Sequence, residues 1–339
     1  MSLNVLEVEE IVRRALAEDI GTGDITTALT VPPASLSRGQ IVANEEGVVA
    51  GLQVAAMVFA VVAEAHAAGS TTVLRRFRPG GGAVGVESVR VTGKPIRVTA
   101  KHLRPPVEIR GLGGREAGSF RGAKELLLRP EVTDGACVQN GNVIAEISGP
   151  TAAILIGERT ALNFLQRLSG IATKTARFVE LVKDTGVRIT DTRKTTPALR
   201  ILEKYAVRVG GGQNHRFGLY DAVLIKDNHI RAAGGVKEAV EAARSGAPHT
   251  MKIEVEADSL AQVEQALEAG AEIILLDNMS PATLRKAVAL CKDRAVTEAS
   301  GRITEQNVVK IAQTGVDLIS VGALTHSVKA LDLSLEIVA

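Results

Sequence analysis

Residues 269–277 have the sequence AGAEIILLD, and this stretch decides the fold of the second half of the chain. Gly270 is placed to end a helix, because glycine readily adopts the left-handed conformation that closes many helices. The apolar run after it has the length of a buried strand and ends in a carboxylate, Asp277. The same order of helix, glycine and strand recurs around Gly186 and Gly315. Repeated units of this kind predict parallel strands joined by right-handed helical connections.

Short apolar strands alternate with helical sequence throughout this half of the chain. The expected strands are 187–190, 222–226, 252–255, 272–277, 295–298 and 317–321. Little sequence is left over between them, which favours a barrel or partial barrel over an open sheet. We therefore predict an α/β protein in which a partial (open) α/β barrel of about six or seven parallel strands, at residues 151–325, carries the active site.

The first 150 residues have a different pattern. Apolar residues recur at helical spacing between positions 5 and 18, residues 39–50 have the character of strands, and residues 52–67 form an apolar, buried helix. This pattern predicts an N-terminal α+β sandwich domain at 1–150. A C-terminal tail, residues 326–339, is expected to pack back on that domain.

A basic segment from about residue 75 to residue 129 interrupts the N-terminal domain. Its alternating pattern and its Pro and Gly clusters are typical of hairpin strands. A basic ribbon could bind a polyanion, but edge strands protected by charge are the commoner cause of this pattern. We expect an extra β-rich insert that forms a surface hairpin or an added interface.

The composition limits the classes of ligand. The chain has 339 residues, with 40 Lys and Arg against 38 Asp and Glu, so the net charge of +2 gives no overall basic surface for nucleic acid. Aromatic residues make up 2% and Trp is absent, which disfavours a stacking platform for single strands. The two cysteines, Cys137 and Cys291, lack the spacing of a disulfide framework or a zinc site. Anion recognition must therefore be local.

The location is expected to be cytoplasmic, without membrane contact. The N-terminal residues are acidic and lack the charged and then apolar pattern of a signal peptide. No run approaches the 18 apolar residues that a spanning helix needs.

Candidate binding cations concentrate in residues 191–226. They follow expected strands or a run of three glycines, which are places that carry function more often than helix faces do. These cations are Arg193, Lys194, His215, Arg216 and Lys226. Three more, Arg200, Lys204 and Arg208, recur every four residues, and such a row is most often a solvated helix face, with ligand contact as the alternative. The segment predicts a site for a strongly anionic ligand.

Candidate carboxylates and phosphate-binding residues end the later strands. In a barrel, the carboxyl ends of the strands share one mouth. Glu256 and Asp277 lie at two of these ends and could bind ribose hydroxyls, hold Mg²⁺ or stabilise a sugar cation. Ser300, Gly301 and Gly322 are small enough for backbone N–H groups to approach a phosphate closely. A phosphorylated sugar with an acidic partner fits this combination of groups.

These residues lie in motifs that together resemble the quinolinate phosphoribosyltransferases, the carboxylating nicotinate-nucleotide pyrophosphorylases. The similarity covers nearly all of residues 5–74 and 130–335. The motifs are TRKTTP at 192–197, GGGQNHR at 210–216, LYD at 219–221, IKDNH at 225–229, LDN at 276–278 and EASG at 298–301, with EDIGTGDIT at 18–26 and ERTALN at 158–163. The insert at about 75–129 is longer than the family usually has there, so it is the departure from the family pattern.

The resemblance implies a reaction and its residues. Phosphoribosyl would pass from phosphoribosyl pyrophosphate to quinolinate with Mg²⁺, giving nicotinate mononucleotide for NAD synthesis, pyrophosphate and CO₂. The implied quinolinate-binding residues are Arg159, Arg193, His215, Arg216 and Lys226. The implied donor-binding residues are Lys194, Glu256, Asp277, Ser300, Gly301 and Gly322. Lys226, Glu256 and Asp277 would be catalytic, and the two carboxylates would hold the metal through water or the donor.

Arg159 has a further implied role. It lies at the margin of the apolar stripe of a helix expected from residue 151, which suggests a contact with another surface or with a ligand. It resembles the arginine that reaches into the neighbouring subunit's site in the family's dimer. A homodimer or a higher assembly is therefore implied.

Two other functions compete with this one. A phosphoribosyltransferase that uses nicotinate would need fewer carboxylate-binding cations than this sequence provides. A catalytically silent relative that binds an anion or a partner would have a damaged site, and none of the matched residues is missing.

Overall fold

The computed structural model describes residues 3–67 and 126–338, which fall into two compact units. Unit 1 combines residues up to Ser169 with those from Leu331 onward, and unit 2 is Gly170–Ala330. Most of the predicted basic insert at 75–129 lies outside the described residues. Its last residues belong to a strand, Leu127–Pro130.

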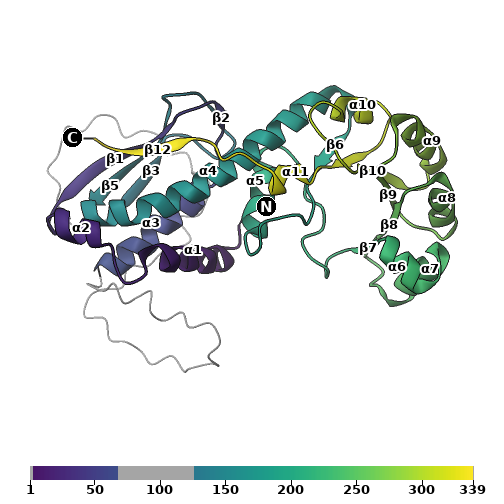
Figure 1. The fold of residues 1–339 in the computed structure, drawn as a ribbon, viewed down its shortest axis with the longest axis horizontal. Helices are drawn as coiled ribbons and strands as arrows, with labels where there is room; N and C mark the ends of the chain where they lie inside the picture. Colours follow the sequence, from purple (N-terminus) through teal and green to yellow (C-terminus); the bar gives the residue numbers. More distant parts are fainter. Residues whose placement is uncertain (1–2, 68–125, 339) are drawn as a thin grey trace. The chain divides into compact units, whose positions relative to one another are not determined.

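Unit 1 combines helices with an antiparallel sheet (Figure 1). Its helices are α1 (Val5–Ile20), α2 (Ile25–Thr30), α3 (Leu52–Ala67) and the first part of α4 (Thr151–Val182). Its main sheet has the order β12-β1-β5-β3, from β1 (Leu36–Ala43), β3 (Leu127–Pro130), β5 (Val143–Pro150) and β12 (Leu333–Val338), while β2 (Gly47–Val48) pairs with β4 (Cys137–Val138). The α+β character predicted for the N-terminal half is confirmed.

The chain passes between the units inside one helix. The predicted N-terminal domain ends at residue 150, directly before α4, whereas the compact units divide at Ser169, within α4. Ile154 and Leu165 of this helix are completely buried. At the other end of the chain, β12 pairs with β1 from Ala43 opposite Leu333 onward, so the C-terminal residues complete the sheet of unit 1.

Unit 2 contains six parallel strands in the order β6-β11-β10-β9-β8-β7. They are β6 (Arg188–Thr190), β7 (Val223–Ile225), β8 (Ile253–Ala257), β9 (Ile273–Asp277), β10 (Val296–Ser300) and β11 (Leu318–Ser320). All six predicted strands are confirmed. Gln213 forms a single parallel bridge with Thr190 on the outer side of β6. The sheet therefore continues by one short segment without closing onto β7 in the described residues, as an open barrel does.

Helices and glycine turns connect the strands. The helices are α5 (Arg200–Val209), α6 (Asp227–Ala233), α7 (Val236–Gly246), α8 (Leu260–Glu268), α9 (Pro281–Cys291), α10 (Val308–Ala312) and α11 (Ala323–His326). Gly186, Gly270 and Gly315 have φ angles of 76°, 82° and 88°, which confirms their predicted role in closing helices.

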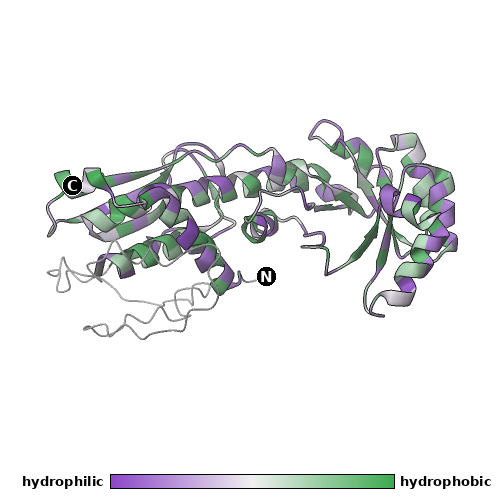
Figure 2. Ribbon diagram, turned by 60° about the horizontal axis from the view of Figure 1, so that its bottom comes forward, coloured by the Kyte–Doolittle hydropathy of each residue, from purple (hydrophilic) through white to green (hydrophobic). Residues whose placement is uncertain are grey.

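In unit 2, helices cover one side of the parallel sheet. Helices α7, α8 and α9 follow one another along one side of the sheet (Figure 1). The strands are mainly hydrophobic in colour and the helices carry both hydrophilic and hydrophobic residues (Figure 2), as expected for amphipathic helices on a buried sheet. Among the described residues, no helix combines the length and the apolar character needed to span a bilayer.

Candidate active site

Strand register places the predicted carboxylates on one face of the sheet. Asp277 pairs with Ser300, and Glu256 pairs with Leu275, two residues before Asp277. Because paired residues of neighbouring strands point to the same face and side chains alternate along a strand, these residues share a face. The same register brings Lys226, just after β7, level with Glu256. The barrel mouth thus assembles residues from four strands.

Lys226 and Glu256 form an ion pair at this mouth. The Nζ of Lys226 lies 3.3 Å from Oε2 of Glu256, and the lysine side chain is 48% exposed. The backbone N–H of Lys226 donates to Nδ1 of His229 at 2.9 Å, which fixes the start of α6. An exposed pair of this kind contributes little to stability, so both groups are free to exchange partners with a ligand.

Two turns at neighbouring strand ends interlock beside Asp277. Asn278 has a φ of 53°, in the left-handed region, and its Nδ2 donates to Oδ2 of Asp277 at 2.7 Å. Its backbone N–H donates to the carbonyl of Ser300 at 2.9 Å. A Cβ on Gly301 would lie 2.9 Å from the backbone nitrogen of Asn278, so only glycine fits there. The interlocked backbone therefore places the Asn278 amide, and that amide fixes the direction of the Asp277 carboxylate.

The loop after β6 lies against the turn after β11. The hydroxyl of Thr325 donates to the carbonyl of Lys194 at 2.8 Å. A Cβ on Gly322 would lie 3.1 Å from Cδ of Lys194. Two of the predicted donor-binding residues, Lys194 and Gly322, are therefore neighbours.

The structure brings two arginines together. Burial lowers the pKa of Arg216, and the nearby positive charge of Arg193 lowers it further. The Nε atoms of both guanidinium groups are buried and have no hydrogen-bond partner among the described residues. Nη1 of Arg216 donates to the carbonyl of Ala222 at 3.2 Å. Like charges with unused donors favour the binding of an anion.

A buried cluster of His215, Glu254 and Glu298 adjoins the arginines. Nε2 of His215 lies 3.0 Å from Oε2 of Glu254 and 3.8 Å from Oε1 of Glu298. Burial and the charge of Glu254 raise the pKa of Glu298 to about 7. Burial alone would lower the pKa of His215, but the hydrogen bond to Glu254 and the charges of both carboxylates raise it above its ordinary value.

The tautomer of His215 limits what this cluster can bind. Its ligand atoms lie within 4.8 Å of those of Glu254 and Glu298, a spacing that could hold a metal ion. However, the backbone N–H of Arg216 donates to Nδ1 of His215 at 2.7 Å. Nδ1 therefore carries no proton, and the proton of the neutral ring lies on Nε2, facing Glu254. A neutral ring that coordinated a metal through Nε2 would carry its proton on Nδ1, where the Arg216 N–H needs an acceptor, so this conformation favours a hydrogen-bonding role for the cluster.

Sequence reasoning missed a buried ion pair behind the site. Nζ of Lys204 donates to the carboxylate of Asp191, and both side chains have 0% exposure. The solvated-face interpretation is therefore wrong for Lys204, and so is ligand contact. Arg208, on the same helix, is exposed as predicted. The position of Asp191, directly after a strand and before the cations, was the available sequence signal.

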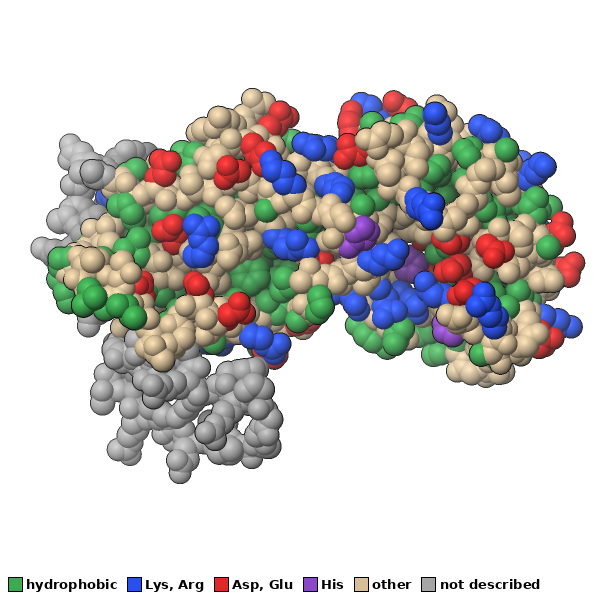
Figure 3. Space-filling model, in the orientation of Figure 1, with side chains coloured by type: hydrophobic (Ala, Val, Ile, Leu, Met, Phe, Trp, Pro, Cys, Tyr) green, Lys and Arg blue, Asp and Glu red, His purple; other side chains and the backbone are tan. Residues whose placement is uncertain are grey.

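Arg159 is the one predicted site residue that belongs to unit 1. It lies on α4 and is exposed, whereas all the other predicted site residues belong to unit 2. Figure 3 shows Lys, Arg, His and acidic side chains gathered on the face of unit 2 near β7 and β8.

The fold and the site together define a class of enzyme. An open parallel barrel whose mouth combines lysines, paired arginines and two carboxylates is suited to joining two anionic small molecules. Residues 171–336 match the C-terminal domain of quinolinate phosphoribosyl transferase, and residues 115–169 match its N-terminal domain. The chain belongs to the quinolinate phosphoribosyltransferase family, and it is an enzyme of the phosphoribosyl-transferring class.

Individual relatives agree with this assignment. The chain is 39% identical over 330 residues to a Mycobacterium leprae protein named nicotinate-nucleotide pyrophosphorylase [carboxylating], covering 96% of this chain and 95% of the relative. It is 53% identical over 204 residues to a probable enzyme of the same name from Bacillus subtilis, covering 60% of this chain and 71% of the relative. A solved nicotinate-nucleotide pyrophosphorylase from Francisella tularensis superposes with a TM-score of 0.78 at 34% identity, over 99% of this chain and 98% of that one.

Proposed function

We propose that this site carries out the reaction of its family with the residue roles described below. Phosphoribosyl is transferred from phosphoribosyl pyrophosphate to quinolinate, and loss of CO₂ and pyrophosphate leaves nicotinate mononucleotide for NAD biosynthesis. The observation that supports this most directly is the pair of half-buried arginines, Arg193 and Arg216, whose Nε atoms are buried and lack a hydrogen-bond partner among the described residues. Quinolinate carries two adjacent carboxylates, whereas nicotinate carries one. A pair of neighbouring arginines therefore matches quinolinate better.

The acceptor is bound at the edge of the barrel near β6 and β7. Arg193 and Arg216 bind its carboxylates by donating charge-assisted hydrogen bonds to them. Lys226 lies at the end of β7 and can contact both substrates. His215 has both ring nitrogens engaged, with the Arg216 backbone and with Glu254, so it supports the acceptor site through Arg216 in this conformation.

The donor is bound across the remaining strand ends. Lys194, Ser300, Gly301 and Gly322 surround its phosphates, and Glu256 and Asp277 face its ribose. These two carboxylates end neighbouring strands on one face, and one oxygen of Asp277 is oriented by Asn278. Such oxygen ligands fit Mg²⁺, which when bound neutralises charge on the departing pyrophosphate.

The chemistry needs position and charge and no protein nucleophile. As pyrophosphate leaves, C1 of the ribose becomes cationic, and the carboxylates of Glu256 and Asp277 stabilise this charge. The pyridine nitrogen then bonds to C1. The ring, now cationic, accepts the electron pair of the breaking C–CO₂ bond, and a proton replaces CO₂ on the same carbon.

The active assembly is a homodimer in which Arg159 of a second copy completes the acceptor site. Arg159 is exposed on α4, and unit 1 also exposes large apolar side chains, including Leu6, Ile25 and Leu29. Exposed apolar side chains are common at interfaces between copies. The silent-relative alternative has no support, because every matched residue is present and described.

The deciding experiment measures release of CO₂ and nicotinate mononucleotide from purified protein with quinolinate, phosphoribosyl pyrophosphate and Mg²⁺. A parallel reaction contains nicotinate as the acceptor. Turnover with quinolinate alone supports the proposal. Turnover with nicotinate alone would transfer the assignment to the competing phosphoribosyltransferase, and no turnover with either, in folded protein, would refute both.

A further inference from the structure

Two chain segments carry the arginines of the acceptor site. The first loop, residues 192–199 after β6, contains Arg193, and the second segment, residues 213–217, contains Arg216. Helix α5 connects them in the sequence and packs beside both. Its side chains bind to each of the two segments, and no residue role described so far uses these contacts.

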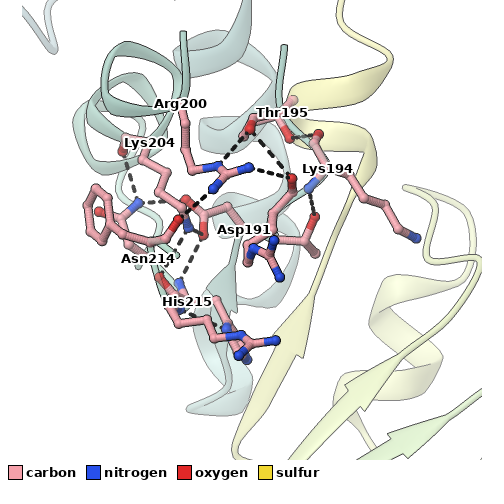
Figure 4. A network of polar contacts seen from close by, with 12 residues as sticks. Asp191, Lys194, Thr195, Arg200, Lys204, Asn214 and His215 are labelled. Atoms are coloured by element: carbon pink, nitrogen blue, oxygen red, sulfur yellow. Dashed lines mark hydrogen bonds and ion pairs between the residues drawn. The ribbon is translucent and has the colours of Figure 1, made fainter. Parts of the chain in front are cut away.

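Arg200, at the start of α5, joins the two segments with one guanidinium group. Its Nε donates to the hydroxyl of Thr195 in the first loop at 2.9 Å. Its Nη1 donates to the carbonyl of Phe217 in the second segment at 2.8 Å. Figure 4 shows the Arg200 side chain directed toward Thr195.

Lys204, one turn further along α5, anchors the second segment to the end of β6. Its Nζ donates to Asp191, directly after β6, and to the carbonyl of His215 at 3.1 Å. Asp191 in turn accepts from the backbone N–H of His215 at 2.9 Å and from the side-chain amide of Asn214 at 2.6 Å. The buried pair therefore holds the backbone next to Arg216 from both of its polar sides (Figure 4).

A third residue of α5 completes this contact face. The backbone N–H of Thr196 donates to Oε2 of Glu203, which is 1% exposed, at 3.1 Å. Arg200, Glu203 and Lys204 are three and four residues apart, so they share one face of the helix. Each of these three charged side chains holds a segment of the acceptor site.

The two arginines give a reason for such bracing. Positive charges close together repel one another, and the pKa of Arg216 is lowered partly by Arg193. Without fixed segments, the flexible loops would move apart and place the guanidinium groups separately in solvent. An acceptor would then have to bring them together at the expense of its binding free energy.

We propose that Arg200 and Lys204 are positioning residues, which hold the first loop and the second segment together so that Arg193 and Arg216 meet the two adjacent carboxylates of the acceptor. Neither residue touches the substrate. The inference rests on the proposed function, because it assumes that these arginines bind quinolinate.

The test compares four variants by calorimetric titration with quinolinate, by the KM of each substrate and by thermal melting. Arg200→Met removes the hydrogen bonds to Thr195, Phe217 and the carbonyl of Arg193 and keeps an unbranched apolar side chain. Arg200→Lys keeps the charge, but a single ammonium group is expected to reach only one segment. Arg208→Met is the matched control, since Arg208 is exposed on the same helix. Arg193→Met tests the acceptor site itself.

We expect Arg200→Met to weaken quinolinate binding by about tenfold, because the three hydrogen bonds that the Arg200 guanidinium group donates to the two segments are lost. The KM of phosphoribosyl pyrophosphate should rise less than quinolinate binding weakens, because the first loop also carries Lys194 but the other donor-binding residues lie outside the two segments. Arg200→Lys should fall between the wild type and Arg200→Met, and Arg208→Met should match the wild type. If Arg200→Met does not fold, Arg200→Lys decides by the same measurements.

Three results would overturn the inference. Wild-type quinolinate binding in the Arg200 variants, together with weakened binding in Arg193→Met, would refute the positioning role of Arg200 and leave the proposed function intact. An equal rise in the KM of both substrates would show a merely structural role. Unchanged quinolinate binding in Arg193→Met would refute the proposed acceptor site, and with it the positioning role of Arg200 and Lys204.

Discussion

The two sides of the barrel mouth place their charges by different means. On the acceptor side, Arg193 and Arg216 have the same sign, and polar side chains of α5 hold their segments. On the donor side, Lys226 and Glu256 have opposite signs, and strand register alone places them 3.3 Å apart. The comparison shows that like charges need a separate supporting network, whereas opposite charges attract one another and need only correctly aligned strand ends.

The largest expected effect comes from breaking the support on the acceptor side. Lys204→Met leaves Asp191 as a buried charge without its cationic partner, which should lower the free energy of unfolding by about 3–5 kcal/mol. Chemical denaturation measures this loss. The double variant Asp191→Asn with Lys204→Met removes both charges and should recover part of the stability. If Lys204→Met were as stable as the wild type, the pair would not be the support described here.

A second expected effect is a pH dependence of stability that comes from Glu298 in the buried cluster. The pKa of Glu298 is raised to about 7 from its ordinary value of 4.5, so the folded state binds this proton more tightly than the unfolded state does. The contribution of this proton to the free energy of unfolding is therefore fully present below pH 4.5 and is lost as the pH rises through about 7. The whole contribution is about 3 kcal/mol.

Glu298→Gln should remove this part of the pH dependence. The measurement is the free energy of unfolding of wild type and variant between pH 4.5 and pH 8, a window set by the ordinary and raised pKa values of this carboxyl. A matched control is Glu264→Gln on α8, which is exposed. Parallel curves for wild type and Glu298→Gln would contradict the assignment of the proton to this cluster.

A third prediction tests the backbone that orients the donor side. Gly301 has a φ of 95°, and an added Cβ would lie 2.9 Å from the nitrogen of Asn278. Gly301→Ala should lower the free energy of unfolding by about 2 kcal/mol and raise the KM of phosphoribosyl pyrophosphate, with quinolinate binding unchanged.

The matched control for Gly301→Ala is Gly186→Ala. Gly186 has a φ of 76° with open space around the missing Cβ. This variant should therefore lose only the cost of placing an alanine in the left-handed backbone conformation, about 1 kcal/mol of the free energy of unfolding. A smaller loss for Gly301→Ala than for Gly186→Ala in urea denaturation would show that the two turns do not interlock.

The sequence predicted the parts of the molecule that depend on local pattern. Six strands followed from apolar runs, and Gly186 marked a helix end because a left-handed residue is needed there. The carboxylates Glu256 and Asp277 could be placed at one mouth because the carboxyl ends of parallel barrel strands meet there. In each case the relevant contacts lie within one element or between neighbouring strands of a regular sheet.

The parts that escaped prediction depend on contacts between distant elements. Helical spacing alone made Lys204 resemble a solvent-facing residue, since only the folded loop supplies the carboxylate of Asp191 that allows its burial. The division of the compact units at Ser169 could not be predicted from the sequence, because a continuous helix gives no change of composition there. The role of Arg159 depends on a second copy of the chain, so it stays a proposal.

The smallest expected effect tests, on the donor side, whether Asn278 orients the Asp277 carboxylate without contributing to the stability of the fold. Asn278 has a φ of 53°, which is strained for a residue with a side chain, and its amide donates to Asp277. In Asn278→Gly, relief of the strain should offset the lost hydrogen bond, so the free energy of unfolding should change by less than about 0.5 kcal/mol. The KM of phosphoribosyl pyrophosphate should rise about threefold, because the Asp277 carboxylate is free to rotate. Asp293→Gly, at a φ of 59° after α9, is the control that relieves strain away from the mouth and should leave the KM unchanged. An unchanged KM in both variants would mean that strand register alone orients Asp277.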